Sequence, residues 1–332
     1  MLKDMLFMFY RRAYAKFWWK LPWLFRRPKA PYIMELELTN DCNQACPHCG
    51  RRLMNREIGY MDIRLFRKIV NEMSCYSWRH LRIVGLGEPA LHPHLEEMLD
   101  DLADKPLKTE FTTNGTLLMR FDSEKILGWP LDILGISIDG FDAKSYSRYR
   151  PNGDYDMLRR KVKKLFETKR KMGHRFPLLR IRNVVFPETT PEQIEAFTRS
   201  WLPFADIITF NTLISKFDYE PNENFRRCED ILLTMHVRWD GRVPLCGYQL
   251  WCGGSEWLGS IRDHSLEELW HADRLLEVSK CHADEVFTGI DFCKNCFYTQ
   301  KRKIILDISK SHDRYRNAAL SRMYRLAISL CE

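Results

Sequence analysis

Three cysteines near the start of the chain have the spacing of a metal-binding loop. Cys42, Cys46 and Cys49 are separated by three and two residues and directly follow an apolar run. If they hold a [4Fe–4S] cluster, three cysteines leave one of the four irons without a protein ligand and open to a small molecule. A structural zinc half-site is the alternative explanation for three cysteines in eight residues.

Four later cysteines can close a second metal centre. Cys228 and Cys246 lie on either side of Gly241, and Cys293 and Cys296 form a CxxC pair. Four thiolates can ligate one iron–sulfur cluster or one zinc ion, and spacing alone does not separate the two. The chain has 11 cysteines and shows no secretory leader, which favours metal binding in a reducing cytoplasm over disulfides.

Glycine-containing turns end three further apolar runs. They are Gly-Leu-Gly-Glu-Pro at residues 85–89, Thr-Asn-Gly at 113–115 and Ser-Ile-Asp-Gly at 137–140. Each alone is an ordinary turn signal, because Gly, Asn and Asp favour loops for backbone reasons. Their order behind a cysteine triad makes them more specific.

Short apolar runs alternate with amphipathic stretches from Tyr32 onward, which predicts an α/β fold with a parallel sheet and crossover helices. An apolar face at residues 63–73 and a capping box at 190–193 mark two of the helices, the second running to about Trp201. The six predicted strands are Tyr32–Thr39, His80–Leu86, Leu107–Thr113, Leu131–Ile138, Leu178–Val185 and Asp206–Asn211.

The sequence from Glu35 to Gly50 resembles the signature of radical S-adenosylmethionine (SAM) enzymes, including a ring side chain, His48, before the third cysteine. The resemblance covers roughly residues 31–305. It implies an open, partial (β/α)6 TIM-like barrel with a [4Fe–4S] cluster on the three cysteines and SAM on the open iron. In this family an electron from the cluster splits SAM into methionine and a 5′-deoxyadenosyl radical, which takes a hydrogen atom from substrate. A reductant such as flavodoxin or ferredoxin is then implied as a partner.

The same resemblance assigns SAM contacts to the glycine-containing turns. Residues 85–89 are similar to the family's GGEP motif, although the first pair is Gly85-Leu86 rather than Gly-Gly. The SAM amino group is therefore expected at Gly87, Glu88 and Pro89, whereas Gly85 receives no role. Further expected contacts to SAM or substrate are Asn114, Ser137, Asp139 and Arg182.

The C-terminal cysteines belong to a region that resembles the SPASM auxiliary domain of this superfamily. The resemblance is carried by residues 237–246, 258–261 and 266–270, with Asp240-Gly241 as a hairpin turn. Full SPASM modules hold two clusters on seven cysteines, but no cysteines follow Cys296 at the expected spacings. We therefore expect one auxiliary [4Fe–4S] cluster, as in twitch-like versions, on Cys228, Cys246, Cys293 and Cys296.

Cys252 and Cys281 are left over from both ligand sets. Either can replace a ligand, give a hydrogen atom to a substrate radical as a catalytic thiol, or be a plain buried thiol, which is the commonest state of free cysteine.

The two ends of the chain are basic and amphipathic. Residues 1–30 carry eight Lys/Arg against one Asp, interleaved with nine aromatics, and supply most of the net charge of +8. Charges recur too often for a transmembrane span or a signal peptide. One hypothesis places this segment peripherally on an anionic membrane, and the other packs it as a helix on the protein.

Substrate class follows from the resemblance alone. Relatives modify ribosomal peptides, or oxidise and epimerise sugars. Only about thirty residues precede Tyr32, which is short for a leader-binding domain, so we expect a cytoplasmic oxidoreductase or epimerase acting on a small-molecule carbohydrate or carrier-linked sugar. A peptide maturase is the alternative, and a non-catalytic zinc or iron–sulfur module that binds nucleic acid is the alternative from another class. The expected parts are an N-terminal helix at 1–30, a radical SAM core at 31–215, an auxiliary domain at 216–305 and a C-terminal helix at 306–332.

Overall fold

The computed structural model describes residues 14, 18, 27–213, 227–251, 254, 256–287, 289–294, 296 and 304–309. The chain divides into two compact units, each built from separate stretches of sequence. Unit 1 comprises residues 1–41, 53–109 and 216–302, and unit 2 comprises residues 42–52, 110–215 and 303–332. The first cysteine triad therefore lies in unit 2, and the C-terminal cysteines lie in unit 1.

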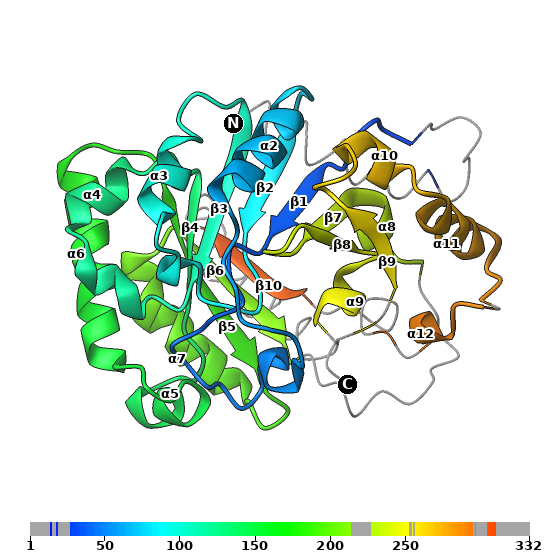
Figure 1. Ribbon diagram of the computed structural model, residues 1–332. Helices are drawn as coiled ribbons and strands as arrows, with labels where there is room; N and C mark the ends of the chain where they lie inside the picture. Colours follow the sequence, from blue (N-terminus) through cyan, green and yellow to red (C-terminus); the bar gives the residue numbers. More distant parts are fainter. Residues whose placement is uncertain are drawn as a thin grey trace. The chain divides into compact units, whose positions relative to one another are not determined.

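The predicted parallel sheet is present, and the α/β partial-barrel class is confirmed (Figure 1). Among the described residues its strand order is β10-β6-β5-β4-β3-β2-β1-β7. β1 to β6 are the six predicted strands, and their ends differ from the prediction by three residues at most. β7 extends the parallel sheet beside β1. The strands are β1 (Ile33–Leu36), β2 (Arg79–Ile83), β3 (Leu107–Thr113), β4 (Ile133–Ser137), β5 (Leu178–Val185), β6 (Ile207–Thr212), β7 (Thr234–Val237) and β10 (Ile304–Ser309).

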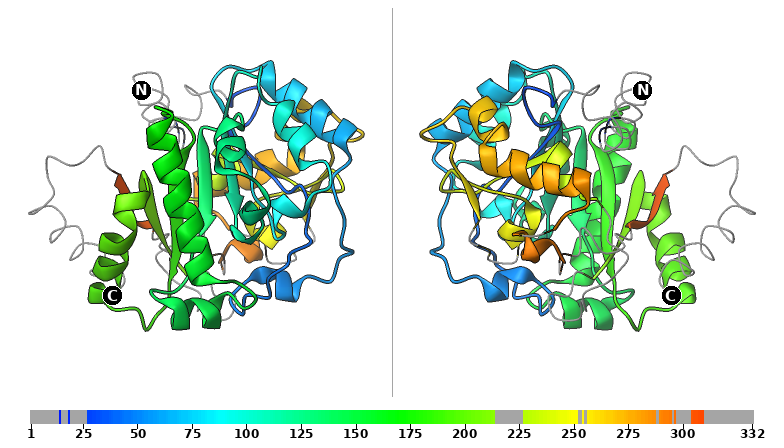
Figure 2. Two further views of the ribbon diagram at one scale, coloured as in Figure 1. Left: turned by 90° about the vertical axis from the view of Figure 1, so that its left-hand side faces the viewer. Right: turned by 90° about the vertical axis from the view of Figure 1, so that its right-hand side faces the viewer.

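The helices of unit 2 cover one face of β4, β5 and β6 (Figures 1 and 2). Alternate residues of β5 are buried, because this face packs on the helices while the other face carries Arg180 and Arg182. The predicted capping box is confirmed, with Thr190 and Gln193 each accepting the other's backbone N–H. The helices are α4 (Ser123–Gly128), α5 (Ala143–Tyr149), α6 (Tyr155–Lys171) and α7 (Pro191–Trp201), with the 3-10 turns η3 (Thr116–Arg120) and η4 (Leu202–Phe204).

Unit 1 combines the first two strands with the cysteine-rich C-terminal region. The predicted apolar face at residues 63–73 belongs to α2, which begins after the N-cap Asp62 and buries Phe66, Ile69, Val70 and Met73. The predicted hairpin turn at Asp240-Gly241 is present, and Gly241 takes a φ of 89°. Unit 1 contains α2 (Ile63–Ser74), α3 (Leu95–Asp100), α8 (Asp230–Leu233), α9 (Gly247–Trp251), α10 (Leu266–Trp270), α11 (Asp273–Asp284), α12 (Asp291–Lys294), the hairpin β8 (Arg242–Pro244) and β9 (Trp257–Ser260), and the turn η2 (Pro89–Leu91).

Parts of the basic N-terminal segment pack on unit 1. The Arg27 guanidinium lies 4.0 Å from the centre of the Trp270 ring and donates to Ile231 O at 2.8 Å. The Tyr14 ring meets the Tyr32 ring at 5.6 Å. These contacts support the hypothesis of packing on the protein, while most of residues 1–26 lie outside the described residues. Within the described part, every helix is too short or too polar to cross a bilayer.

The C-terminal segment corrects one prediction. The helix expected from residue 306 is wrong at its start, because residues 304–309 form β10, which pairs antiparallel with β6. Consecutive Ile304 and Ile305 followed by Leu306 favour a strand, since β-branched side chains fit a pleated surface. The rest of the predicted helix lies outside the described residues.

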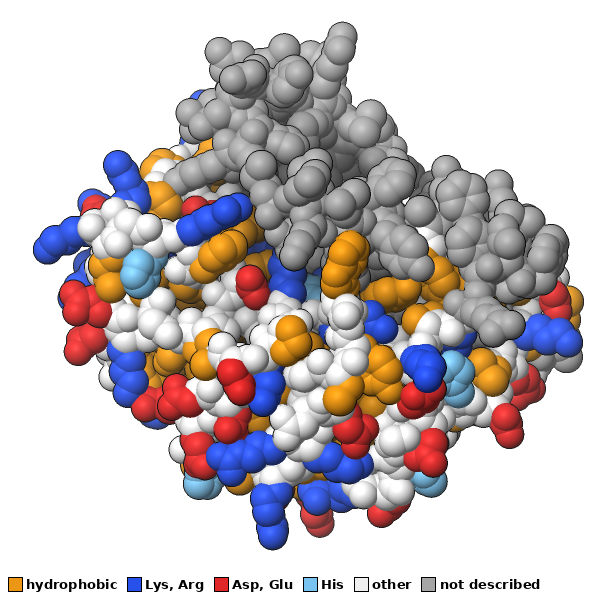
Figure 3. Space-filling model, turned by 90° about the horizontal axis from the view of Figure 1, so that it is seen from above, with side chains coloured by type: hydrophobic (Ala, Val, Ile, Leu, Met, Phe, Trp, Pro, Cys, Tyr) orange, Lys and Arg blue, Asp and Glu red, His pale blue; other side chains and the backbone are white. Residues whose placement is uncertain are grey.

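On the described part of the face in Figure 3, basic and acidic side chains are intermingled rather than gathered into separate patches.

Candidate functional site

The cysteine triad occupies the short loop that opens unit 2. Cys46 is buried, whereas Cys42 and Cys49 are partly exposed. The loop folds back on itself through the Cys49 N–H, which donates to Cys46 O at 3.1 Å. The Arg51 N–H points at Cys49 Sγ at 3.5 Å, and such N–H groups stabilise thiolate sulfur.

The three thiols influence one another electrostatically. Burial raises the pKa of Cys46 to about 11, Arg150 opposes this, and the neighbouring Cys49 and Cys42 add to it. A thiol with a raised pKa stays protonated until a metal displaces the proton. Three neighbouring thiols, of which Cys42 and Cys49 are partly exposed, fit a cluster that keeps one iron open.

Among the described residues, no group of three or more His, Cys, Asp or Glu side chains is already arranged around a single metal-ion position.

Asn114 supports the cysteine loop from the end of β3. Its Nδ2 donates to Asn43 Oδ1 at 2.8 Å and lies 4.0 Å from Cys42 Sγ. Its Oδ1 accepts from the Thr116 N–H at 2.9 Å. Asn114 is an expected SAM contact, and its described contacts support the cysteine loop.

Asp139, at the end of β4, is committed to protein partners. It is only 1% exposed, and its Oδ1 accepts from the Val184 N–H at 2.9 Å. Its Oδ2 lies 3.1 Å from His48 Nε2 and 2.6 Å from Arg150 Nη2. Burial alone raises the pKa of Asp139, but Arg150, His48 and the Val184 N–H outweigh it and lower the pKa. The expected SAM contact is therefore a fully engaged carboxylate.

The face of β3, β4 and β5 opposite the helices is polar. Arg180 Nη1 pairs with Glu110 Oε1 at 2.8 Å, and Arg182 Nη1 donates to Thr112 Oγ1 at 3.1 Å. Gly135 lies between these strands, where an added Cβ would be 3.2 Å from Thr112 Oγ1. Arg182 pairs in register with Ser137, so these two expected contacts are neighbours on β5 and at the end of β4.

The turn at residues 85–89 is built against the end of β1 in unit 1. The Glu88 N–H donates to Asp41 O at 2.6 Å. An added Cβ on Gly87 would lie 2.3 Å from Thr39 O and 2.5 Å from Asp41 O, so no side chain fits there. The turn can approach the residue before Cys42 only because position 87 is glycine.

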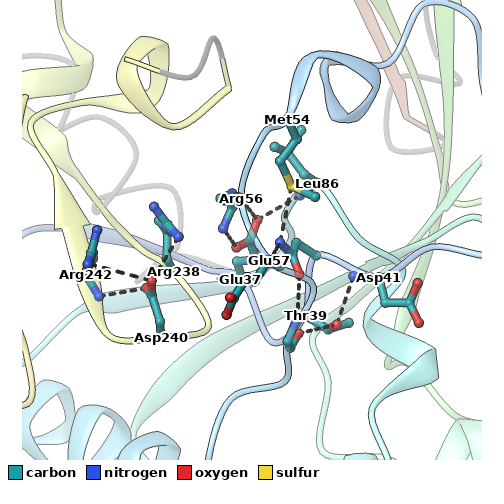
Figure 4. Close-up of polar contacts among 12 residues, drawn as sticks. Glu37, Thr39, Asp41, Met54, Arg56, Glu57, Leu86, Arg238, Asp240 and Arg242 are labelled. Atoms are coloured by element: carbon teal, nitrogen blue, oxygen red, sulfur yellow. Dashed lines mark hydrogen bonds and ion pairs between the residues drawn. The ribbon is translucent and has the colours of Figure 1, made fainter. Parts of the chain in front are cut away.

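Glu37 anchors the same turn and explains Gly85 (Figure 4). The Leu86 N–H donates to Glu37 Oε2 at 3.2 Å, and an added Cβ on Gly85 would lie 2.6 Å from Glu37 Cγ. Both Glu37 oxygens also pair with Arg56 at 2.7 Å. The loop after the triad is further tied by Asn40 Nδ2, which donates to Glu57 O at 2.8 Å.

Sequence patterns did not identify Glu37 and Arg56 as a pair. The available signal was a Glu inside an apolar strand, because a buried charge needs a partner. The partner itself lies 19 residues away in an irregular loop.

The C-terminal cysteines gather in unit 1. Cys228, Cys246, Cys293 and Cys296 are all buried. Burial raises the pKa of Cys246 well above its ordinary value, and Asp230, Cys228 and Cys293 add to the effect. The Cys296 N–H donates to Cys293 O at 3.3 Å. Cys228, Cys246 and Cys293 influence one another's pKa, and Cys296 is joined to Cys293 through the backbone, which fits the expected auxiliary cluster.

Of the two unassigned cysteines, Cys281 is partly exposed on α11, and Cys252 lies outside the described residues. Burial raises the pKa of Cys293 first, and the nearby Cys228 and Cys281 raise it further. Cys281 therefore lies beside the auxiliary cysteines.

A buried histidine links β7 to β1 and to the auxiliary cysteines. His236 Nδ1 lies 3.2 Å from Glu35 Oε2, and His236 Nε2 lies 3.0 Å from Asp230 Oδ2. Asp230 Oδ2 also accepts from the Gly247 N–H, next to Cys246, at 2.9 Å. Burial alone would lower the pKa of His236, but the two carboxylates outweigh it and raise the pKa to about 10. Sequence patterns did not predict this network.

Comparisons with known proteins agree with the two cysteine sets. A model of the radical SAM superfamily matches residues 36–200, and a model of the SPASM iron–sulfur cluster-binding domain matches residues 228–297. A tungsten-containing aldehyde ferredoxin oxidoreductase cofactor-modifying protein of Pyrococcus furiosus is 24% identical over 286 residues, which is 72% of this chain and 80% of the relative.

Two solved structures share the fold. SuiB of Streptococcus suis bound to its precursor peptide SuiA superposes with a TM-score of 0.63 at 16% identity, covering 76% of this chain and 67% of SuiB. BtrN in complex with AdoMet and 2-DOIA gives a TM-score of 0.52 at 16% identity, covering 80% of this chain and 92% of BtrN. The matched regions hold both cysteine sets and the strand-end turns, and the chain belongs to the radical SAM superfamily with a C-terminal SPASM iron–sulfur domain.

Proposed function

We propose that this radical SAM enzyme oxidises or epimerises a small carbohydrate or a carrier-linked sugar. When bound, the cluster on Cys42, Cys46 and Cys49 and the SAM at its open iron would supply a 5′-deoxyadenosyl radical that takes a hydrogen atom from the substrate. The chain's own residues have to hold the two cofactors and orient the substrate.

The turn at residues 85–89 is proposed to receive the SAM amino group. Gly87 lets the backbone come close to Asp41, next to Cys42, and Glu88 and Pro89 follow in the same turn. Ser137 and Arg182 are proposed to face the rest of SAM or the substrate, because they lie side by side on the polar face of β4 and β5. Asn114 and Asp139 are also proposed to contact SAM, while their described hydrogen bonds and ion pairs support the cysteine loop.

One auxiliary [4Fe–4S] cluster is proposed on Cys228, Cys246, Cys293 and Cys296. Four thiolates close such a cluster and leave no iron for SAM, which suits electron transfer to or from a substrate radical. Cys281, beside this set, is proposed as a nearby thiol available to a substrate radical, and Cys252 keeps the same proposal from its sequence alone.

The polar face of β3 and β5 supports the proposal of a carbohydrate substrate. Glu110, Thr112, Arg180 and Arg182 lie on the face of β3 and β5 away from the helices, and all four are hydrogen-bonding groups. Such a lining suits a hydroxyl-rich or charged molecule better than an apolar one. BtrN, whose structure holds AdoMet with 2-DOIA, is covered over 92% of its length, so the two chains also have comparable extents.

A peptide maturase is the second candidate, favoured by the similarity to SuiB, whose structure holds a precursor peptide. We propose a cytoplasmic location and a flavodoxin or ferredoxin as electron donor for either candidate. Liposome co-sedimentation with and without residues 1–30 tests the proposal of peripheral membrane contact.

The test begins with anaerobically purified protein and quantitation of iron, zinc and sulfide. Two [4Fe–4S] clusters require about eight irons per chain, and dithionite with SAM is expected to release 5′-deoxyadenosine. Candidate sugars deuterated at single carbons are then compared with candidate peptides, and deuterium in 5′-deoxyadenosine identifies the substrate. A Cys42→Ala, Cys46→Ala, Cys49→Ala variant that still forms 5′-deoxyadenosine would overturn the proposal.

A further inference from the structure

A buried ion network lies directly behind the cysteine loop of unit 2. Arg150 follows α5, and its Nε and Nη2 lie 2.7 Å and 2.6 Å from Asp139 Oδ2. The same oxygen lies 3.1 Å from Nε2 of His48, the residue before Cys49. The Arg150 and Asp139 side chains are 12% and 1% exposed, so water contributes little to either.

The third guanidinium nitrogen reaches the cysteine loop from the other side. Arg150 Nη1 donates to Gln44 Oε1 at 3.2 Å, and Cys46 Sγ donates to the same oxygen at 3.7 Å. One side chain therefore contacts residue 44 directly and residue 48 through Asp139. These two residues bracket Cys46 in the loop.

The ion pair has an orientation relative to Cys46. Gln44 Oε1 lies 3.2 Å from Arg150 Nη1 and 3.7 Å from Cys46 Sγ, so one oxygen atom joins the guanidinium to the sulfur. The contacts of Asp139 Oδ2 are instead with Nε and Nη2, on another edge of the guanidinium. Cys46 lies at the positive end of the pair.

We propose that Arg150 is a positioning residue for the radical SAM cluster, fixing the loop through Gln44 and Asp139 and turning the positive end of its ion pair toward Cys46. The inference rests on the proposed function, because it assumes a cluster on the triad. A residue that only stabilised the fold would have no electrostatic effect of defined sign on that cluster.

The consequence is a contribution to the reduction potential. One-electron reduction adds negative charge to a cluster, and nearby charges and hydrogen bonds tune its potential. Removing the Arg150 guanidinium makes reduction of the cluster harder, and removing the Asp139 carboxylate makes it easier. Arg150→Met is therefore expected to shift the potential to more negative values, and Asp139→Asn to more positive values. The double variant is expected between them, because both charges are gone.

The experiment is a mediated redox titration of the reconstituted protein, followed by EPR of the reduced cluster. A Cys228→Ala, Cys246→Ala, Cys293→Ala, Cys296→Ala background removes the auxiliary signal, and iron content is measured after desalting. Arg148→Met is the matched control, since Arg148 is exposed on α5, two residues from Arg150. It is expected to leave the potential and the iron content unchanged.

Shifts of opposite sign for Arg150→Met and Asp139→Asn support the proposal. Shifts of the same sign, or potentials equal to the Arg148→Met control, overturn it. If Arg150→Met retains no iron, the sign of the Asp139→Asn shift decides alone. Dithionite-driven 5′-deoxyadenosine formation by the wild-type protein is measured separately, because its absence refutes the proposed function, whereas unchanged potentials refute only the role of Arg150.

Discussion

Arg56→Met tests how the turn at residues 85–89, which is proposed to bind SAM, is held. Glu37 is fully buried, and both its oxygens pair with Arg56 at 2.7 Å while one also accepts from the Leu86 N–H (Figure 4). Removing the guanidinium leaves a buried carboxylate without its counter-charge. We expect Arg56→Met to destabilise the protein and to weaken SAM binding, because the anchor of residues 85–89 is disturbed.

The magnitude follows from the burial of the pair. Breaking a buried ion pair on one side costs about 3–5 kcal/mol. An exposed pair contributes about 0–1 kcal/mol, and Arg64, which is 88% exposed, pairs with Asp62 at 3.5 Å in that way. Arg64→Met is therefore the matched control. With a urea dependence near 3 kcal/mol/M, Arg56→Met lowers the unfolding midpoint by roughly 1 M or more.

The assay is urea unfolding of the metal-free chain by circular dichroism, with SAM affinity of the reconstituted protein measured by equilibrium dialysis. Glu37→Gln combined with Arg56→Met removes the buried charge yet keeps an oxygen for the Leu86 N–H. This double variant is expected to be more stable than Arg56→Met alone. A midpoint for Arg56→Met equal to that of Arg64→Met, or a double variant less stable than the single one, would contradict the assignment.

Three further outcomes are expected. Gly87→Ala places a Cβ 2.3 Å from backbone oxygen and should abolish measurable SAM binding in equilibrium dialysis, whereas Gly128→Ala, with nothing within 4 Å, should bind SAM as the wild type does. The folded-state pKa of His236 is raised from 6.5 to about 10, so its stabilisation is complete below pH 6.5 and is lost as pH rises toward 10. The unfolding free energy is measured against pH between these limits. It should fall more steeply for the wild type than for His236→Gln, by up to about 1.4 kcal/mol per pH unit, and equal slopes would refute the network. Cys296→Ala should lower the iron content by one cluster and spare dithionite-driven SAM cleavage, and loss of cleavage would show that the two cysteine sets are not independent.

The regular elements were predictable because their signals are local. β3 and β5 have the predicted bounds, since a turn signal or a proline follows each of them closely. β10 was mistaken for a helix because Ile304, Ile305 and Ile308 also fit a helical spacing, and only the pairing with β6 decides between them. β7 has a charged His236 in its centre, which breaks the apolar run that would mark a strand.

The contacts that hold the cysteine loops could not be predicted from spacing. Arg150 and His48 are 102 positions apart in the sequence and are linked through Asp139. Arg56 and Glu37 are 19 positions apart. No periodicity relates such residues, because each pairing depends on where an irregular loop returns to the sheet. What the sequence does display is an ionisable residue among apolar ones, Glu37 after β1 and His236 in β7, and such a residue needs a polar partner when it is buried.

Buried charge, rather than apolar packing, fixes the ligand-bearing segments in both units. Arg150 and Asp139 stand behind the first triad, and His236 with Asp230 stands behind Cys246. Buried ion pairs add little net stability, because desolvation offsets their attraction, but they accept few alternative geometries. Replacing both members of such a pair by apolar residues should therefore cost little in unfolding free energy while it alters the potential of the adjacent cluster. If such a replacement lowered the unfolding free energy and left the reduction potential unchanged, the networks would serve folding alone.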